Sequence, residues 1–329
     1  MTTVETVTGP VEAGELGFTL IHEHLRCQDE AVAAQWPDRV TLSEDEPFAV
    51  QAGGEHDEAV KAAERATERG VKTIADPTAM FLGRDVEFMR KVSEQTGLQV
   101  VPCTGIYTYD HLPQFFQHRS PEQIAEMFVG DIERGIQGTE IKAAFIKCAA
   151  DLPGVTENVE KIHRASAMAS VQTGAPIMAH SAPAAETGPK QVDVFEQEGV
   201  DLSRVQIAHC GDSDDPGYIE GLIDRGVFVG LDRFGLELFL PFEKRIEVAL
   251  ALLEKGHAER IFLAADSCAT LDWYPPEAVP VLQEAGQVVD WDIRIVPDKV
   301  IPALRDAGIT DDQLETMTVG NAVSWLTAS

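Results

Sequence analysis

Long apolar runs, basic clusters and paired cysteines are all scarce in this sequence of 329 residues. No stretch approaches the roughly 18 consecutive apolar residues that a membrane-spanning helix needs, so we expect no membrane segment. The amino terminus lacks a basic segment followed by an apolar one, so we expect no signal peptide. The five cysteines are odd in number and show no CxxC spacing. This pattern is typical of reduced thiols in a cytoplasmic protein rather than of a disulfide framework.

Positive charge is also scarce. The chain has 26 Lys and Arg against 55 Asp and Glu, which gives a formal net charge of −29. Such a chain repels phosphate backbones and anionic membrane surfaces unless it carries a basic patch, and no Lys/Arg cluster is present. We therefore expect no nucleic-acid or membrane partner, and the acidity favours neutral or cationic substrates over anions.

Short β-branched runs alternate with longer helical stretches along the whole chain. The eight predicted strands are residues 19–25, 71–76, 98–104, 142–148, 175–180, 204–210, 227–232 and 261–266. Between them, segments such as 56–70 and 120–136 repeat apolar residues at a period near 3.6, as amphipathic helices do. Several of these helices are expected to end at a glycine just before the next strand (Gly70, Gly97, Gly174, Gly199 and Gly226).

Eight hydrophobic strands that alternate with helices indicate a parallel sheet covered by helices. The fold class predicted is α/β, with a single (β/α)8 TIM barrel as one domain over residues 1–329. An open doubly wound sheet is the alternative, but no GxGxxG follows the first strand. Residues 26–57 and 267–297 form long first and eighth loops, and long loops in a compact domain are usually functional.

Polar side chains fall at the carboxyl ends of the predicted strands. In the segment TLIHEHL, His22 and His24 are two positions apart and share one face of the first strand. Four more such residues lie at or near the ends of strands four, five, six and eight: Lys147, His180, His209 and Asp266. These ends converge on the active-site face of a barrel, and imidazole and carboxylate groups are metal ligands. The remaining histidines are expected to be surface or structural residues (His56, His111, His118, His163 and His257).

Four histidines and an aspartate exceed what one tetrahedral zinc ion needs. A cationic lysine among them would repel a metal, but Lys147 lies in the apolar run AAFIK, where burial lowers the pKa of an amine. A neutral amine can add CO2 to become a carbamate, and the two carbamate oxygens can bridge two metal ions. The number of ligands therefore favours a binuclear site, and a carbamate would explain why a lysine lies among them.

The same residues carry a family resemblance. HxH on the first strand, Lys on the fourth, His on the fifth and sixth, and Asp on the eighth resemble the phosphotriesterase-like lactonases of the amidohydrolase superfamily. The likeness extends through TLIHEHL, CTGIYTYDHLP, AAFIKCAADLPG, AHCGDSDD, GLDRFG and DSCATLDW. The resemblance implies that one metal is held by His22, His24, Lys147 and Asp266, and the other by Lys147, His180 and His209. It also implies that a hydroxide bridges the metals and that Asp266 takes its proton.

Three further positions match the lactonase branch. Tyr107 corresponds to a tyrosine beside the hydroxide, Arg233 to an arginine of the pocket, and Trp273 to a tryptophan against the acyl side of the substrate. The alternative is structural: the two aromatic residues pack only, and Arg233 pairs with Asp232 or another acid. Ala265 stands where relatives often carry His, and the segments SAPAAETG and VGNAVSWL also depart from the common pattern.

The sequence therefore predicts a metal-dependent hydrolase that opens small neutral lactones, such as N-acyl-homoserine lactones (quorum quenching) or other γ- and δ-lactones. Promiscuous hydrolysis of organophosphate triesters is expected as a side activity. The alternatives are a dedicated phosphotriesterase (aryldialkylphosphatase) and a metal-dependent binding barrel without turnover. Zinc is the expected metal, with Mn, Co and Fe as alternatives. The resemblance implies a homodimer, and the cysteine pattern predicts a cytoplasmic protein.

Overall fold

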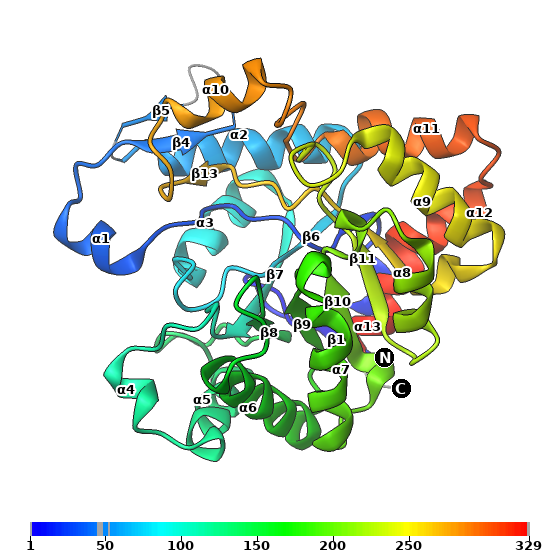
Figure 1. Cartoon of the computed structure of the whole chain (residues 1–329). Helices are drawn as coiled ribbons and strands as arrows, with labels where there is room; N and C mark the ends of the chain where they lie inside the picture. The colour runs from blue at the N-terminus through cyan, green and yellow to red at the C-terminus, as the bar shows by residue number, and fades with distance from the viewer. Residues whose placement is uncertain (1, 45–48, 52, 328–329) are drawn as a thin grey trace.

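The centre of the computed structural model, which describes residues 2–327 apart from 45–48 and 52, is an eight-stranded sheet (Figure 1). Its strands are β3 (Thr19–Leu20), β6 (Thr73–Asp76), β7 (Gln99–Gly105), β8 (Phe145–Ala149), β9 (Ile177–His180), β10 (Val205–Ala208), β11 (Phe228–Leu231) and β12 (Ile261–Leu263). The order from β3 to β12 follows the chain, and each neighbouring pair is parallel.

Hydrogen bonds beyond the ends of β3 and β12 join these two edge strands and nearly close the barrel. The amide of Asp266 donates to the carbonyl of His22 (3.1 Å), and the amide of His24 donates to the carbonyl of Ser267 (2.8 Å). The buried carboxylate of Glu23 accepts from the amides of Ala265 and Ser267 and from the Ser267 hydroxyl. The predicted TIM barrel is thus confirmed, and the open doubly wound sheet is wrong.

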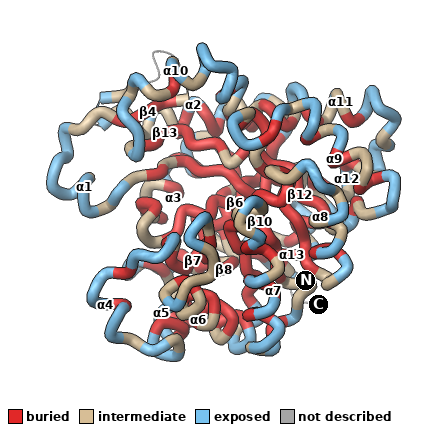
Figure 2. The backbone as a smooth tube through the Cα atoms, viewed as in Figure 1, coloured by how far each residue is buried: buried red, intermediate tan, exposed pale blue. Residues whose placement is uncertain are grey.

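Helices surround the sheet and leave the strands as the most buried part of the chain (Figures 1 and 2). They are α2 (Glu55–Glu68), α3 (Val86–Thr96), α5 (Pro121–Glu133), α6 (Glu157–Thr173), α7 (Thr187–Gln197), α8 (Pro216–Ile223) and α9 (Phe242–Glu254), followed after β12 by α11 (Ile301–Asp306), α12 (Asp311–Glu315) and α13 (Asn321–Leu326). As predicted, α3 and α6 end at glycines in the left-handed conformation, Gly97 and Gly174. Within the described ranges, none of the helices has the length and apolar content that crossing a bilayer requires.

The amino end of the barrel is sealed by side chains. Trp325 of α13 is fully buried, and its ring lies 5.4 Å from that of Phe145 and 6.0 Å from that of Phe262. Phe228 stacks on Phe262 at 4.9 Å beside them. Because these rings fill the end where the strands begin, only the carboxyl end is left for a site.

Several observed strands are shorter than predicted, and the missing residues belong to the candidate site. The first strand was expected over 19–25 but ends at Leu20, the sixth ends at Ala208 and the eighth at Leu263. His209 and Asp266 adopt left-handed backbone conformations, with φ of 64° and 53°. A strand cannot continue through such a residue, so these side chains leave the ladder and turn across the barrel mouth.

The two long loops contain short elements of their own and pair with each other. The first loop carries α1 (Glu30–Gln35), β4 (Thr41–Ser43) and β5 (Ala49–Val50), and the eighth carries β13 (Thr270–Leu271) and α10 (Ala278–Glu284). Strands β13, β4 and β5 form an antiparallel sheet in the upper part of Figure 1. The first and eighth loops therefore act as one covering layer beside the barrel mouth.

Candidate metal centre

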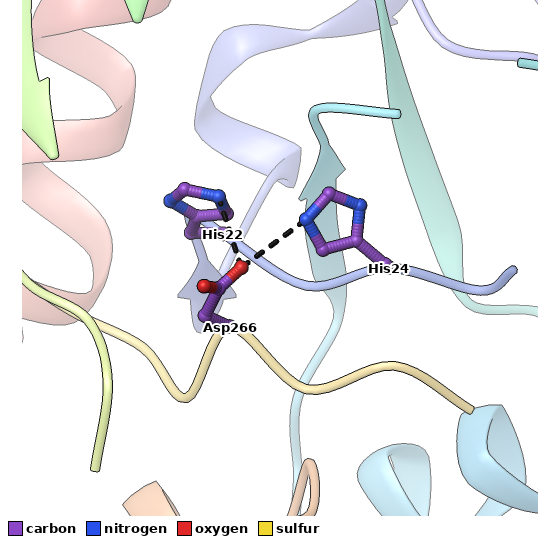
Figure 3. Close-up of side chains that lie close together, drawn as sticks. All are labelled: His22, His24 and Asp266. Carbon is purple, nitrogen blue, oxygen red and sulfur yellow. Dashed lines mark ion pairs between the residues drawn. The ribbon is translucent and has the colours of Figure 1, made fainter. Parts of the chain in front are cut away.

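The structure brings the six predicted ligands together at the carboxyl end of the barrel. The Nε2 atoms of His22 and His24 both lie 3.2 Å from Oδ1 of Asp266, and the three side chains point toward one another (Figure 3). They come from the segments that close the barrel between β3 and β12. This triad is one group of the described residues able to hold a metal ion.

The other three predicted ligands lie around the same centre. Nδ1 of His180 is 2.9 Å from Nε2 of His209, which in turn is 3.9 Å from Oδ2 of Asp266. Nζ of Lys147 is 3.2 Å from Nε2 of His22. Both histidines and Lys147 are about 1% exposed, so the centre is withdrawn from bulk water except at Asp266.

Each histidine is oriented by a hydrogen bond on its far nitrogen. Asp232 bonds Nδ1 of both His22 (3.1 Å) and His209 (3.0 Å), although it also forms a possible metal-binding group with them. Because it engages the ring atoms that face away from Asp266 and Lys147, we interpret it as an orienting acceptor. His24 is held by Thr78 at Nδ1 (2.7 Å).

His180 is oriented the opposite way, with Nε2 on Asp151 (2.7 Å) and Nδ1 toward the centre. The second ring nitrogen of a metal-bound histidine usually bonds a carboxylate, a backbone carbonyl or water. Here it bonds a carboxylate in three of the rings and a hydroxyl in His24. Four buried imidazoles, each so oriented, and a shared carboxylate therefore fit a divalent metal site.

Burial sets the protonation of most of the centre. It lowers the pKa of His22 and of His180 to about 4 and that of His209 below its ordinary value, so that these imidazoles are neutral and able to bind metal. His24 differs, because Cys27 and Asp266 outweigh burial and raise its pKa. A metal ion at its Nε2 would have to displace that proton.

The pKa of Lys147 shifts in the direction that burial favours, whereas the pKa of Asp266 shifts against it. Burial lowers the pKa of Lys147 to about 8, which makes its neutral amine accessible near neutral pH. Burial disfavours the Asp266 carboxylate, but the neighbouring histidines and Arg233 outweigh that cost and hold its pKa well below the ordinary value. Asp266 is thus an anion in the centre.

The three predicted substrate residues line one cavity of about 470 Å³ above the centre. The hydroxyl of Tyr107 lies 3.2 Å from Nδ1 of His180, and its ring centroid lies 6.1 Å from that of Trp273. Arg233 does not pair with Asp232. It donates to Oδ2 of Asp266 (2.9 Å) and to Asp212 (3.0 Å), and so holds the carboxylate of the centre in place.

Several residues of the site were not predicted from the sequence. Asp232 ends the run VFVGLD at the seventh strand, so the rule that selected the other strand-end residues could have found it. Tyr109 lies two positions after Tyr107 in the same loop, and the two hydroxyls are 2.5 Å apart. Only its closeness to Tyr107 in the sequence could have suggested it as a site residue. Thr78 and Asp151 carry no pattern that distinguishes them from other loop residues. His163 is structural as expected, buried in α6 and bonded to Gln191.

Comparison with known proteins agrees with this geometry. A sequence model described as the phosphotriesterase family matches residues 2–326. The chain belongs to the phosphotriesterase family. As a member of this family, in the amidohydrolase superfamily, it is a metal-dependent hydrolase.

Similar members of the phosphotriesterase family cover nearly the whole chain. An aryldialkylphosphatase of Saccharolobus solfataricus is 44% identical over 309 residues, which are 93% of this chain and 94% of that protein. A phosphotriesterase homology protein of Mycobacterium tuberculosis is 40% identical over 332 residues, which are 98% and 96% of the two chains. The solved structure of the phosphotriesterase from Mycobacterium tuberculosis has a TM-score of 0.90 at 39% identity and covers 98% of both chains.

Proposed function

We propose that this phosphotriesterase-family hydrolase opens lactones, with N-acyl-homoserine lactones or other γ- and δ-lactones as its substrates, and hydrolyses organophosphate triesters more slowly. The observation that carries the proposal is the cavity of about 470 Å³, in which a buried histidine centre lies beneath an extended apolar wall. A lactone with an acyl chain offers one reactive carbonyl for the centre and one apolar tail for the wall.

The wall of the cavity is built largely from the covering loops. Its apolar members include Leu42, Leu82, Leu236, Leu238, Phe239, Leu271, Trp273, Val279, Leu282 and Val288. Among the described residues that line the cavity, Arg233 is the only lysine or arginine, and it is already paired with two carboxylates. A substrate anion would therefore find no uncommitted cation, which favours a neutral ester.

The side chains of the centre divide the chemistry between them. Metal ions bound here would supply Lewis acidity that polarises the reacting C=O or P=O group. Asp266, an anion steadied by Arg233, accepts the proton of the attacking water at its carboxylate. Burial and Tyr109 raise the pKa of Tyr107, so its neutral phenol donates a hydrogen bond to the oxygen on which negative charge develops.

The proposal includes two divalent metal ions, with zinc as the expected metal, and a carboxylated Lys147 that would help to hold them. The support is the position of its Nζ, 3.2 Å from a ligand nitrogen of His22, and its lowered pKa. A protonated amine there would oppose a divalent ion, whereas a carbamate adds two oxygen donors. We also expect the five buried thiols to reflect a reducing compartment such as the cytoplasm, and a homodimer by family resemblance.

A dedicated phosphotriesterase is the second candidate, because a relative with 44% identity is named an aryldialkylphosphatase. Both reactions use the same centre, so only substrate preference separates them. A binding barrel without turnover is disfavoured, because the chain belongs to a family of metal-dependent hydrolases and keeps Asp266, a carboxylate that a pure binder would not need as a base.

The proposal is tested by a substrate panel on protein whose metal content has been measured. We expect kcat/KM to be higher for lactones than for a dialkyl aryl phosphate such as paraoxon. For lactones, kcat/KM should rise with acyl-chain length, because each buried methylene contributes about 0.8 kcal/mol. An enzyme faster on paraoxon than on every lactone would leave the dedicated phosphotriesterase as the better assignment.

Two variants test the roles of Tyr107 and Trp273 in this substrate preference. Tyr107→Phe should lower lactone kcat by about 10²–10³, the usual cost of one oxyanion donor, and lower paraoxon turnover much less. Trp273→Ala should flatten the dependence on chain length. Trp36→Ala is the matched control, since Trp36 is 65% exposed in the first loop and is not part of the cavity wall. Equal losses on both substrate types in Tyr107→Phe would contradict the role given to its phenol.

A further inference from the structure

Two cysteine thiols lie side by side in the wall of the substrate cavity. Sγ of Cys27, from the first loop, is 3.4 Å from Sγ of Cys268, from the eighth loop, although the residues are 241 positions apart. Both are free thiols, and both line the cavity. Cys268 also lines an adjoining cavity of about 260 Å³, so the pair borders two cavities.

The backbone already holds the two segments together. Cys27 donates its amide to the carbonyl of Thr270 (2.8 Å), and its own carbonyl accepts from the amide of Asp272 (3.3 Å). Three residues before Cys27, His24 forms a parallel bridge with Cys268. The thiols therefore face each other because the chain is paired on both sides of them.

The pair also lies close to residues of the metal centre, where a change in the oxidation state of the sulfurs could affect catalysis. Cys27 follows His24 by three positions, and Cys268 follows Asp266 by two. Around the sulfur atoms, Leu42, Leu271 and Val279 form a small apolar cluster that is separate from the main core. The sulfur atoms thus lie close in the chain to two metal ligands and also border the cavity wall.

We propose that Cys27 and Cys268 form a reversible disulfide in the presence of a peroxide, and that the disulfide lowers the hydrolase activity. One thiol sulfur attacks the O–O bond of the peroxide, which gives a sulfenic acid and, from hydrogen peroxide, one water. The second thiol sulfur then attacks the sulfenic sulfur, so that the S–S bond forms, the S–O bond breaks and a second water leaves. The two thiols are oxidised by two electrons, and a dithiol reductant returns them.

The expected loss of activity follows from geometry. The sulfur atoms must approach from 3.4 Å to the roughly 2.0 Å of a disulfide bond, which draws the first and eighth loops together. A displacement of about 1 Å at catalytic groups commonly costs on the order of a hundredfold in rate. We expect the oxidised enzyme to have a kcat/KM roughly ten- to a hundredfold below that of the reduced enzyme.

The test treats the metal-loaded enzyme with hydrogen peroxide and then with dithiothreitol. Oxidation should lower the intact mass by about 2 Da, the two hydrogens lost to water, and a non-reducing digest should yield one Cys27–Cys268 linked peptide. Reduction should restore both mass and activity. Because the mass readout is independent of substrate, this result stands or fails separately from the lactonase proposal.

Variants separate the pair from other oxidation. Cys27→Ala and Cys268→Ala, each compared with its own reduced form, should lose the reversible inactivation, whereas Cys103→Ala, at a buried thiol of β7, should keep it. Metal content measured before and after peroxide controls for damage to the centre. Formation of sulfinic acid without a linked peptide, a bridge to another cysteine, or a disulfide that leaves kcat/KM unchanged would each overturn the switch.

Discussion

Lys147 shows how a single side chain decides the chemistry of the centre. It is about 1% exposed in β8, with Met178 Sδ 3.4 Å and His22 Nε2 3.2 Å from its Nζ. No carboxylate is recorded within ion-pair distance of this amine among the described residues, which agrees with the fall of its pKa to about 8 through burial. An amine in this position can contribute to a metal site only in its neutral form.

Substitution of Lys147 tests this interpretation. Lys147→Ala should lose bound metal and activity, and a short carboxylic acid in the buffer should partly restore both by replacing the carbamate oxygens. Lys147→Arg should remain inactive, since a guanidinium stays protonated and cannot carry CO2. Metal content and kcat are measured together, with Lys142→Ala, at a partly exposed lysine five positions earlier, as the control. Wild-type rates in Lys147→Arg would rule out the carbamate.

The ligands were predictable from the sequence because each lies at or near the carboxyl end of a predicted strand, whereas the partners Thr78 and Asp151 were not. His22 and His24 repeat at the spacing of a strand face, and His180 ends β9 as expected. Thr78 reaches His24 only because β6 lies next to β3 in the sheet, and Asp151 reaches His180 from the turn after β8. Such contacts depend on how loops cross the barrel mouth, which local sequence patterns do not encode.

Among the elements, strand β11 supports the centre through a glycine. A Cβ at Gly230 would lie 2.2 Å from Oδ2 of Asp232 and 3.2 Å from Cα of Ala208 on the adjacent strand. The sequence predicted this strand but gave no reason for its glycine. The structure supplies one: the missing side chain leaves room for the carboxylate that orients His22 and His209.

Gly230→Ala is therefore expected to act as a metal-site mutation rather than as a simple strand mutation. The added methyl group must displace Asp232, and loss of such an orienting partner typically lowers metal affinity about 10–100-fold. The measurement is competition for metal with a chelator. Gly221→Ala in α8 is the control, because nothing lies within 4 Å of its Cβ position and alanine favours a helix. Unchanged metal affinity in Gly230→Ala would show that the Asp232 side chain can shift without loss of its orienting role.

At the scale of the whole molecule, the two ends of the barrel have different tasks. The aromatic side chains around Trp325 close the amino end, while the carboxyl end holds the histidine centre beneath the covering loops. Ligands come from segments at β3, β8, β9 and β10 and from the turn after β12. Bound metal would therefore tie most of the barrel together, including the seam between the first and last strands.

Metal removal should consequently affect stability as well as activity. We expect two metal ions per active chain, because the candidate ligands exceed one tetrahedral site. A ligand at 100 times its Kd adds about 2.7 kcal/mol to the free energy of unfolding, so chelation should lower Tm and abolish turnover together.

The measurement is elemental analysis beside calorimetry, first on the loaded enzyme, then after chelation, and again after a divalent ion is restored. We expect one cooperative transition in each state, since the seam residues His22, His24 and Asp266 join the first strand to the last in a single barrel. Because these same side chains are the proposed ligands, Tm should return with metal in parallel with activity. A fully active enzyme with one metal per chain would contradict the binuclear centre, and a Tm that does not respond to chelation would show that the seam is held by the protein alone.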